Sequence, residues 1–165
     1  MNGGWVYTDY TYRAASSALG PTWEFDSSGN FEGWTVVNAY AEVTGGTLNL
    51  DPGFGDYWIT GPAVSFAASA FRTIRLRMAS NASDSIGKIY FRTASEDYSE
   101  SKSVTFVVNS CSLCGSAPYY EYVVSMSVNG NWTGSNTGIR VDPAQAGTAG
   151  TNRDAIGIDY VRIVP

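Results

Sequence analysis

Short segments of alternating apolar and polar residues, separated by glycine, asparagine and serine, run along most of the chain. In the stretch TIRLRMA, for example, Ile74 and Leu76 would share one side of an extended strand, with Arg75 on the other. A period of two is typical of strands that turn one face to a core and the other to solvent. Many short strands at near-regular spacing predict an all-β fold, an antiparallel sandwich or barrel.

The predicted strands are short and follow one another after the first twenty or so residues. They comprise residues 22–25, 35–38, 42–43, 47–50, 58–60, 64–66, 73–79, 88–93, 103–108, 119–126, 137–141 and 155–164. No segment has the apolar spacing of an amphipathic helix, and a single helical turn at residues 67–70 is the most that we expect.

Length and charge narrow the class of protein. A chain of 165 residues is expected to form one domain and can bury a core without help from a metal or a disulfide. A net charge of −5 argues against nucleic acid as a partner, and no apolar run is long enough to span a membrane. Charged residues make up only 15% of the chain, while glycine and tyrosine are abundant, which favours an extracellular or cell-surface protein.

Residues 1–21 differ from the rest of the chain. They combine Trp5 and several tyrosines with a small-residue linker that ends at Pro21. We therefore divide the chain into an N-terminal aromatic arm and linker, residues 1–21, and a β-sandwich domain, residues 22–165. The arm has the composition of a strand, and it would pair either with the sheet edge of its own domain or with a neighbouring molecule.

The sequence contains two cysteines, Cys111 and Cys114, and no histidine. Two cysteines cannot complete a tetrahedral zinc site by themselves, and the lack of histidine excludes histidine-based catalytic triads. We expect a small disulfide between these cysteines in an oxidising compartment, with two ordinary thiols as the alternative.

Asn81 and Asn131 begin glycosylation sequons, which chance also produces in a chain rich in serine and threonine.

Several short motifs occur in a characteristic order. They are WEFD at residues 23–26, GW at 33–34, GGTL at 45–48, W-x-G at 132–134, IRVDP at 139–143 and IDYVRI at 158–163. In order and spacing the pattern resembles the jelly-roll carbohydrate-binding modules of the galactose-binding-like class, over about residues 22 to 165. The resemblance implies an antiparallel jelly-roll β-sandwich that binds a polysaccharide or oligosaccharide without catalysis.

Two carboxylates far apart in the sequence suit a calcium site. Asp26 opens a polar, glycine-containing loop and Asp159 begins the final apolar strand, and calcium binds carboxylate and carbonyl oxygens. The resemblance implies that these two residues hold a structural calcium ion, with carbonyl oxygens from Ser28 and Gly33 and a further oxygen from Asn30. Alternatively, Asp26 only caps its own turn.

Sugar rings stack on aromatic side chains, and their hydroxyl groups pair with planar charged groups. The candidate ligand-binding residues are Tyr57, Trp58, Tyr90, Arg92, Tyr98 and Arg140. For each aromatic residue the competing role is core packing, and for each arginine it is pairing with a carboxylate on a neighbouring strand. Trp23, Trp34 and Trp132 are expected to be core residues or loop anchors, because the similar modules carry their fold pattern at these positions.

The sequence predicts no enzyme. Glycosidases need only two carboxylates, but Glu96, Asp97 and Glu100 belong to the segment SEDYSESK, which has the composition of a solvated loop. The leading hypothesis is a carbohydrate-binding module. The alternative is a structural subunit of an extracellular fibre, in which the arm of residues 1–21 adds a strand to the sheet of the next identical molecule.

Overall fold

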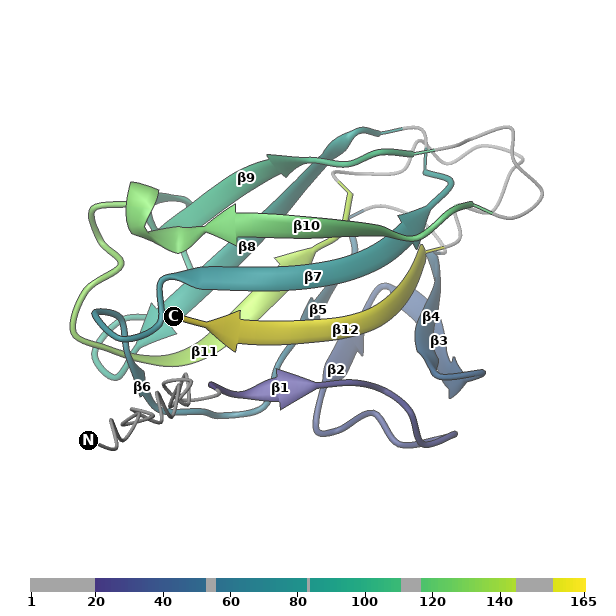
Figure 1. Cartoon of the computed structure of the whole chain (residues 1–165), viewed down its shortest axis with the longest axis horizontal. Coiled ribbons are helices and arrows are strands. Elements are labelled where there is room, and N and C mark those ends of the chain that lie inside the picture. Colours follow the sequence, from purple (N-terminus) through teal and green to yellow (C-terminus); the bar gives the residue numbers. More distant parts are fainter. Residues whose placement is uncertain (1–19, 53–55, 83, 111–116, 145–155) are drawn as a thin grey trace, which may run out of the picture.

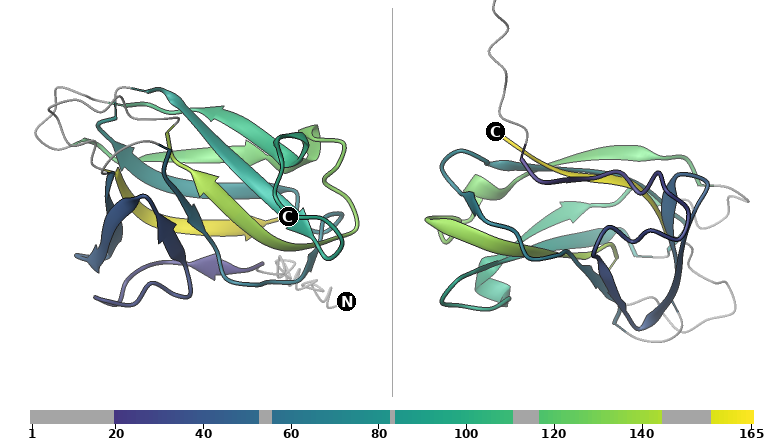
Figure 2. Two further views of the ribbon diagram at one scale, coloured as in Figure 1. Left: turned by 180° about the vertical axis from the view of Figure 1, so that it is seen from behind. Right: turned by 90° about the horizontal axis from the view of Figure 1, so that it is seen from below.

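Two antiparallel sheets lie face to face and enclose one hydrophobic core (Figure 1; Figure 2, right). The structure is a computed structural model, and it describes residues 20–52, 56–82, 84–110, 117–144 and 156–165. The predicted all-β antiparallel sandwich is confirmed. The arm at residues 1–19 and the cysteines Cys111 and Cys114 lie outside the described residues, so arm pairing, the fibre alternative and the disulfide stay predictions.

The first sheet has the strand order β10-β7-β12-β4-β3, with β1 paired to the C-terminal half of β12. Its strands are β1 (Thr22–Trp23), β3 (Ala39–Thr44), β4 (Thr47–Pro52), β7 (Thr73–Ser80), β10 (Tyr120–Ser125) and β12 (Ile156–Val164). The first and last strands of the domain are therefore neighbours.

The second sheet has the order β2-β5-β11-β8-β9, with β6 paired to the start of β11. Its strands are β2 (Thr35–Val37), β5 (Trp58–Thr60), β6 (Phe66–Ala67), β8 (Ile86–Thr93), β9 (Ser103–Val107) and β11 (Ser135–Asp142). Two 3₁₀ turns, η1 (Glu100–Lys102) and η2 (Met126–Val128), lie before β9 and after β10. Seen from behind, this sheet is in front (Figure 2, left).

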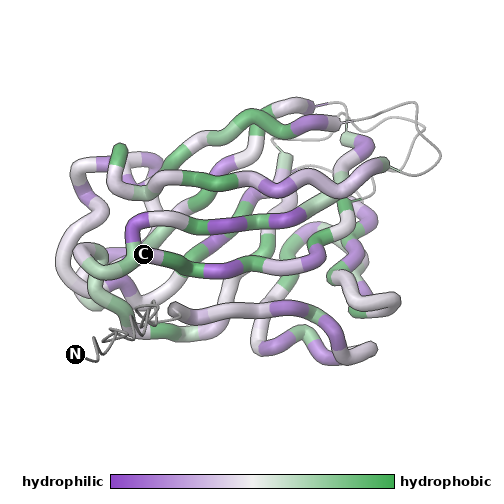
Figure 3. Tube along the Cα trace, viewed as in Figure 1, coloured by the Kyte–Doolittle hydropathy of each residue, from purple (hydrophilic) through white to green (hydrophobic). Residues whose placement is uncertain are grey.

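The alternation in the sequence decides which side chains form the core. Hydrophobic and hydrophilic residues alternate along β7 and β12 (Figure 3), and Ile74, Leu76 and Ile163 are fully buried. Trp132 packs edge-on against Phe91, with ring centroids 4.8 Å apart. Of the two roles expected for Trp23, Trp34 and Trp132, the place in the core is confirmed, since each of these side chains is buried.

The chain changes sheets at Asn38. This residue lies between β2 of the second sheet and β3 of the first, and its φ of 57° is left-handed. Asparagine tolerates this region better than most residues, and here its side-chain amide donates to the Asp56 carbonyl oxygen at 2.7 Å. The sequence predicted strands on both sides of this corner but not their assignment to different sheets.

Candidate ligand-binding face

The outward face of the second sheet gathers aromatic and charged side chains from three neighbouring strands. In the antiparallel register Arg140 of β11 lies opposite Tyr90 of β8, and Asp142 lies opposite Lys88. On the other side of β11, Val141 pairs with Ile59 of β5, which places Asp142 beside Trp58. We call Trp58, Lys88, Tyr90, Arg140 and Asp142 the platform. No two of these residues are adjacent in the sequence, so the register of the sheet brings their side chains together.

Arg140 lies at the centre of the platform. Its guanidinium carbon is 4.0 Å from the centroid of the Trp58 ring and 4.8 Å from that of Tyr90, both within cation–π distance. Its Nε and Nη2 donate to the two carboxylate oxygens of Asp142, each at 2.6 Å. This two-bond pair holds the guanidinium plane in one orientation. Burial raises the pKa of the Asp142 carboxyl, and the bonds from Arg140 oppose that rise.

A second cluster joins the platform to the turn η1. The Tyr90 hydroxyl donates to one carboxylate oxygen of Glu100 at 2.6 Å, and Lys88 Nζ donates to the other at 2.9 Å. Because Arg140 and Lys88 lie against its ring, Tyr90 is only 6% exposed. Tyr90 does lie on the outward face, as predicted, but its ring is covered, so it positions charged groups and is not an open stacking surface.

Arg92 and Tyr98 extend this face toward the loops. The Arg92 guanidinium carbon lies 5.5 Å from the centroid of the Tyr98 ring, and the Tyr98 hydroxyl donates to the Ile139 carbonyl oxygen at 3.2 Å. Gly138 makes room for both, since a Cβ there would lie 2.7 Å from Arg92 Nε and from the Tyr98 hydroxyl oxygen. The glycine of the GIRVDP stretch is therefore needed for close side-chain approach.

Of the predicted aromatic residues, Trp58 and Tyr57 point in opposite directions. Trp58 is half-buried on the platform, whereas Tyr57 is fully buried in the core. Tyr57 as a ligand-binding residue does not agree with the structure, because successive side chains point to opposite sides of the sheet. The sequence prediction missed Lys88, Asp142 and Glu100 as members of this face; their opposite charges on predicted strand and loop positions were the available signal.

The arginines of the first sheet are paired with carboxylates. Arg75 lies 3.5 Å from Glu121, Arg77 forms an ion pair with Asp159, and Arg162 binds Glu24 through two bonds of 2.7 and 2.6 Å. The outward arginines of this sheet thus pair with carboxylates. The Glu24–Arg162 pair ties β1 to β12.

The predicted calcium ligands do not form a fitting donor set in the described residues. Asp26 is exposed, and the carboxylate of Asp159 is occupied by the Arg77 guanidinium, which would repel a nearby cation. No group of three or more acidic side chains suited to a metal occurs in the described part of the chain. The calcium ion held by Asp26, Ser28, Asn30, Gly33 and Asp159 stays a prediction.

The loop after Phe25 is organised by a carboxylate instead. The two side-chain oxygens of Glu32 accept hydrogen bonds from the main-chain N–H groups of Glu24 and Phe25, at 3.0 and 3.1 Å. The Asn30 side chain in turn accepts from the N–H of Glu32 at 3.0 Å. Phe25 and Glu32 both have a positive φ, 54° and 51°, so these bonds hold a strained loop.

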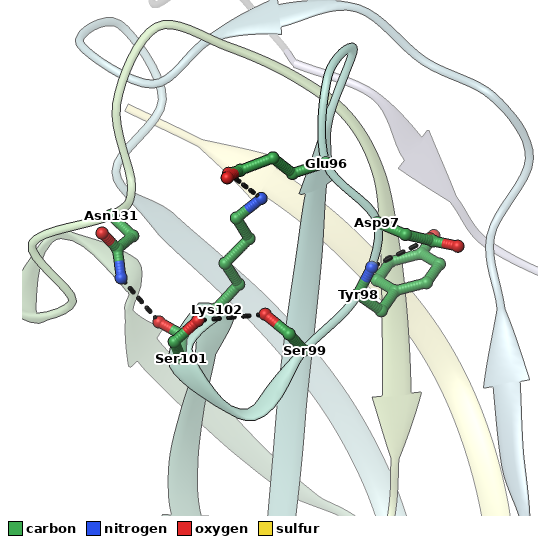
Figure 4. Close-up of a pocket in the computed structure, with 7 residues that line it drawn as sticks. All are labelled: Glu96, Asp97, Tyr98, Ser99, Ser101, Lys102 and Asn131. Atoms are coloured by element: carbon green, nitrogen blue, oxygen red, sulfur yellow. Dashed lines mark hydrogen bonds and ion pairs between the residues drawn. The ribbon is translucent and has the colours of Figure 1, made fainter.

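A shallow polar pocket of about 370 Å³ lies at one end of the second sheet, beside η1 (Figure 4). Glu96 forms an ion pair with Lys102 across it, and Asp97 accepts a hydrogen bond from the Tyr98 main-chain N–H at 2.8 Å. The neighbouring Glu100 belongs to the Lys88–Tyr90 cluster. The three acidic residues of this loop therefore have separate partners, two of them lysines.

The glycosylation positions differ in their surroundings. Asn131 is exposed, and its side-chain N–H donates to the Ser101 carbonyl oxygen at 2.9 Å, while Asn81 is half-buried. Their modification stays a prediction.

In the described ranges, no helix has both the length and the apolar character needed to cross a membrane.

Comparison with known proteins finds its matches among solved structures. No protein-family model and no curated protein sequence matches the chain. A family 29 carbohydrate-binding module matches with a TM-score of 0.53 and 16% identity, over 84% of this chain and 83% of that chain. A variant of the module CBM29-2 in complex with cellulohexaose matches with a TM-score of 0.55 and 15% identity, over 88% of this chain and 92% of that chain. A variant of CBM29-2 in complex with mannohexaose has a TM-score of 0.54, 16% identity, and coverage of 84% and 86%. The chain therefore has the jelly-roll β-sandwich fold of the family 29 carbohydrate-binding modules.

Proposed function

We propose that the chain is a non-catalytic, extracellular carbohydrate-binding module that binds a polysaccharide on the platform. The observation that carries the proposal is the row formed by Trp58, Arg140 and Asp142, which places an aromatic ring, a guanidinium and a carboxylate side by side. Arg140 packs against the Trp58 ring, but Trp58 is half-buried and not buried like Tyr90, so its exposed part would contact the C–H face of a sugar. The charged planar groups donate to and accept from its hydroxyls, which is the mixture that a largely preformed binding site needs.

The structural neighbours support glycan binding by residues of the same types. CBM29-2 has been crystallised with mannohexaose and with cellulohexaose, and variants with lysine, arginine, aspartate or tyrosine replaced by alanine served to probe its ligand recognition. These four residue types also make up most of the platform. Binding through one face of a rigid sheet would raise the local concentration of any attached enzyme at a glycan surface.

The carboxylates near the platform have binding rather than acid–base surroundings. Asp142 is held by Arg140, and Glu100 is held by Lys88 and Tyr90. Hydrogen bonding from Lys88 lowers the pKa of Glu100. A glycosidase general acid needs a raised pKa, since it must be protonated near neutral pH. Burial does raise the pKa of Asp142, but both of its carboxylate oxygens are bound by Arg140. These partners support a binding role.

Replacing Trp58 by alanine is expected to weaken glycan retention by roughly tenfold or more, because aromatic anchors carry a large share of binding energy. Affinity electrophoresis in gels that contain glucomannan or soluble cellulose derivatives measures the effect. Tyr40→Ala is the matched control, since Tyr40 is 81% exposed on β3 of the other sheet. Equal retention of wild type and both variants across the glycan panel would reject the platform as the binding site.

Retention is expected to be constant between about pH 6 and pH 9 and to fall on the acid side. Hydrogen bonding to Glu100 raises the pKa of Lys88, and burial raises the pKa of Tyr90, so both keep their protons through the alkaline part of this range. Burial raises the pKa of Asp142, and its protonation at low pH would remove the orienting partner of Arg140, while hydrogen bonding from Lys88 lowers the pKa of Glu100. The Glu100→Gln variant should leave the acid midpoint of retention unchanged; a shifted midpoint would assign the transition to Glu100.

A further inference from the structure

The pocket beside η1 is built from two segments that are far apart in the sequence. Glu96 to Lys102 form one side, and Asn131, from the loop after η2, forms the other (Figure 4). Asn129 and Asn131 hold the two segments together by donating to the Ser101 carbonyl oxygen at 3.0 and 2.9 Å. With a volume of about 370 Å³, the pocket is at the small end of the range that holds small ligands, about 300–1,000 Å³.

Lys102 has an unusual place in this pocket. Its side chain is only 6% exposed, and its ammonium group has one charged partner, the carboxylate of Glu96, which is itself 67% exposed. The ammonium nitrogen itself is buried, and beyond this ion pair it has no hydrogen-bond partner in the described residues. Lysine is rarely buried in this way, and its three donors require acceptors. The buried Lys102 ammonium therefore holds the exposed Glu96 carboxylate in place at the pocket.

The charges of the pocket restrict its ligand. Glu96 and Asp97 are negative and Lys102 is positive, so a metal cation would meet the ammonium and an anion would meet two carboxylates. The remaining polar groups include the hydroxyls of Ser99 and Ser101, which lie 3.0 Å apart. Donors and acceptors of both signs around one small space suit a neutral, hydroxyl-rich group.

The pocket is linked to the platform by the turn η1 and by Tyr98. In the turn η1, Glu100 contacts Lys88 and Tyr90 of the platform, and two residues later Lys102 lines the pocket. Tyr98 also belongs to both, since it lines the pocket and lies beside Arg92 on the outward face of the sheet. A glycan chain that crosses the platform toward η1 would meet the pocket next.

We propose that this pocket binds one further neutral sugar residue of the glycan that lies on the platform, with Glu96 and Ser101 contacting its hydroxyl groups and Lys102 holding the Glu96 carboxylate in position. The proposal rests on the proposed function, because it extends the same glycan beyond the platform. It assigns to the loops a share of the affinity for long oligosaccharides that the sheet alone would not provide.

Calorimetric titration of the full chain with cellotriose, cellohexaose and the matching manno-oligosaccharides tests this proposal. Lys102→Met keeps the length of the side chain and removes the ammonium, and Asn131→Ala removes the side-chain amide on the other wall. Lys102→Met frees the Glu96 carboxylate and is expected to weaken hexasaccharide binding roughly tenfold, the loss typical of one hydrogen bond to a charged group. Asn131→Ala releases the bond to the Ser101 carbonyl oxygen and is expected to weaken hexasaccharide binding as well, and both variants should affect the trisaccharide much less. Arg75→Met is the matched control, a cation paired with a carboxylate on the opposite sheet.

The outcomes separate the pocket from the platform. Unchanged affinity of both pocket variants at both lengths, while Trp58→Ala weakens binding, would reject the pocket and leave the proposed function intact. An equal loss at both lengths would also reject it, because the variants would then act through the shape of the platform. If Trp58→Ala has no effect on any oligosaccharide, the proposed function fails, and the pocket proposal fails with it. Should Lys102→Met not fold, as judged by circular dichroism, Asn131→Ala decides.

Discussion

Replacing Asp142 by alanine should destabilise the fold by about 3 kcal/mol and should also remove most glycan retention, because the change leaves a largely buried arginine without its partner. The side chains of Arg140 and Asp142 are only 19% and 7% exposed, and two bonds of 2.6 Å join them. Without the carboxylate, the guanidinium must either stay uncompensated or leave the Trp58 and Tyr90 rings. In both cases the platform loses the group at its centre.

Asp56→Ala is the matched control for this prediction. Asp56 lies 4.0 Å from the same guanidinium, but its side chain is 64% exposed, and exposed ion pairs contribute at most about 1 kcal/mol. Urea unfolding measures the free energy of both variants, and affinity electrophoresis measures their retention. If the two variants lose equal stability, Asp142 is not the dominant partner of Arg140.

The second large effect is expected in the loop after β1. Glu32→Ala should lower the free energy of unfolding by about 2–3 kcal/mol, since it leaves two main-chain N–H groups without a charged acceptor. These N–H groups belong to Glu24 and Phe25, and Phe25 is fully buried in the core. Loss of the bonds would also loosen Glu24, whose carboxylate binds Arg162. Thermal and urea unfolding measure the loss, and Glu32→Gln should fall between wild type and alanine.

Glu42→Ala provides the comparison for Glu32, because Glu42 is an exposed acidic residue on the neighbouring strand β3. Its replacement should change the stability by no more than about 0.5 kcal/mol. A Glu32→Ala variant as stable as Glu42→Ala would show that the loop does not depend on this carboxylate.

The same melting experiments test calcium. If Asp26 and Asp159 share an ion, chelator should lower the melting temperature of the wild type and added calcium should restore it by mass action. Because Asp159 is already paired with Arg77, we expect only a small change in melting temperature with chelator or calcium. A melting curve that does not respond to chelator or calcium would exclude a structural calcium ion at these residues.

By itself, the sequence determined local features, namely which segments are strands and which side chains share a face. Alternation of apolar and polar residues predicted strands such as β7 and β12, because side chains in an extended chain alternate with a period of two whatever the strand pairs with. The same pattern placed Tyr90 and Arg140 on outward faces. It could also have assigned Tyr57 to the core, since Tyr57 directly precedes Trp58, the first residue of β5.

Only the tertiary structure decided which of these side chains meet. The contact of Arg140 with Trp58, the cover that Lys88 and Arg140 place over Tyr90, and the bond between Glu24 and Arg162, 138 residues apart, all depend on strand order and register. The period of two carries no information on strand order or register, because a strand keeps the same alternation next to any partner. The pocket beside η1 likewise needs two loops that only the packing of the sheets brings together. The sequence therefore determined the strands and their faces, and the pairing of the strands decided the platform and the pocket.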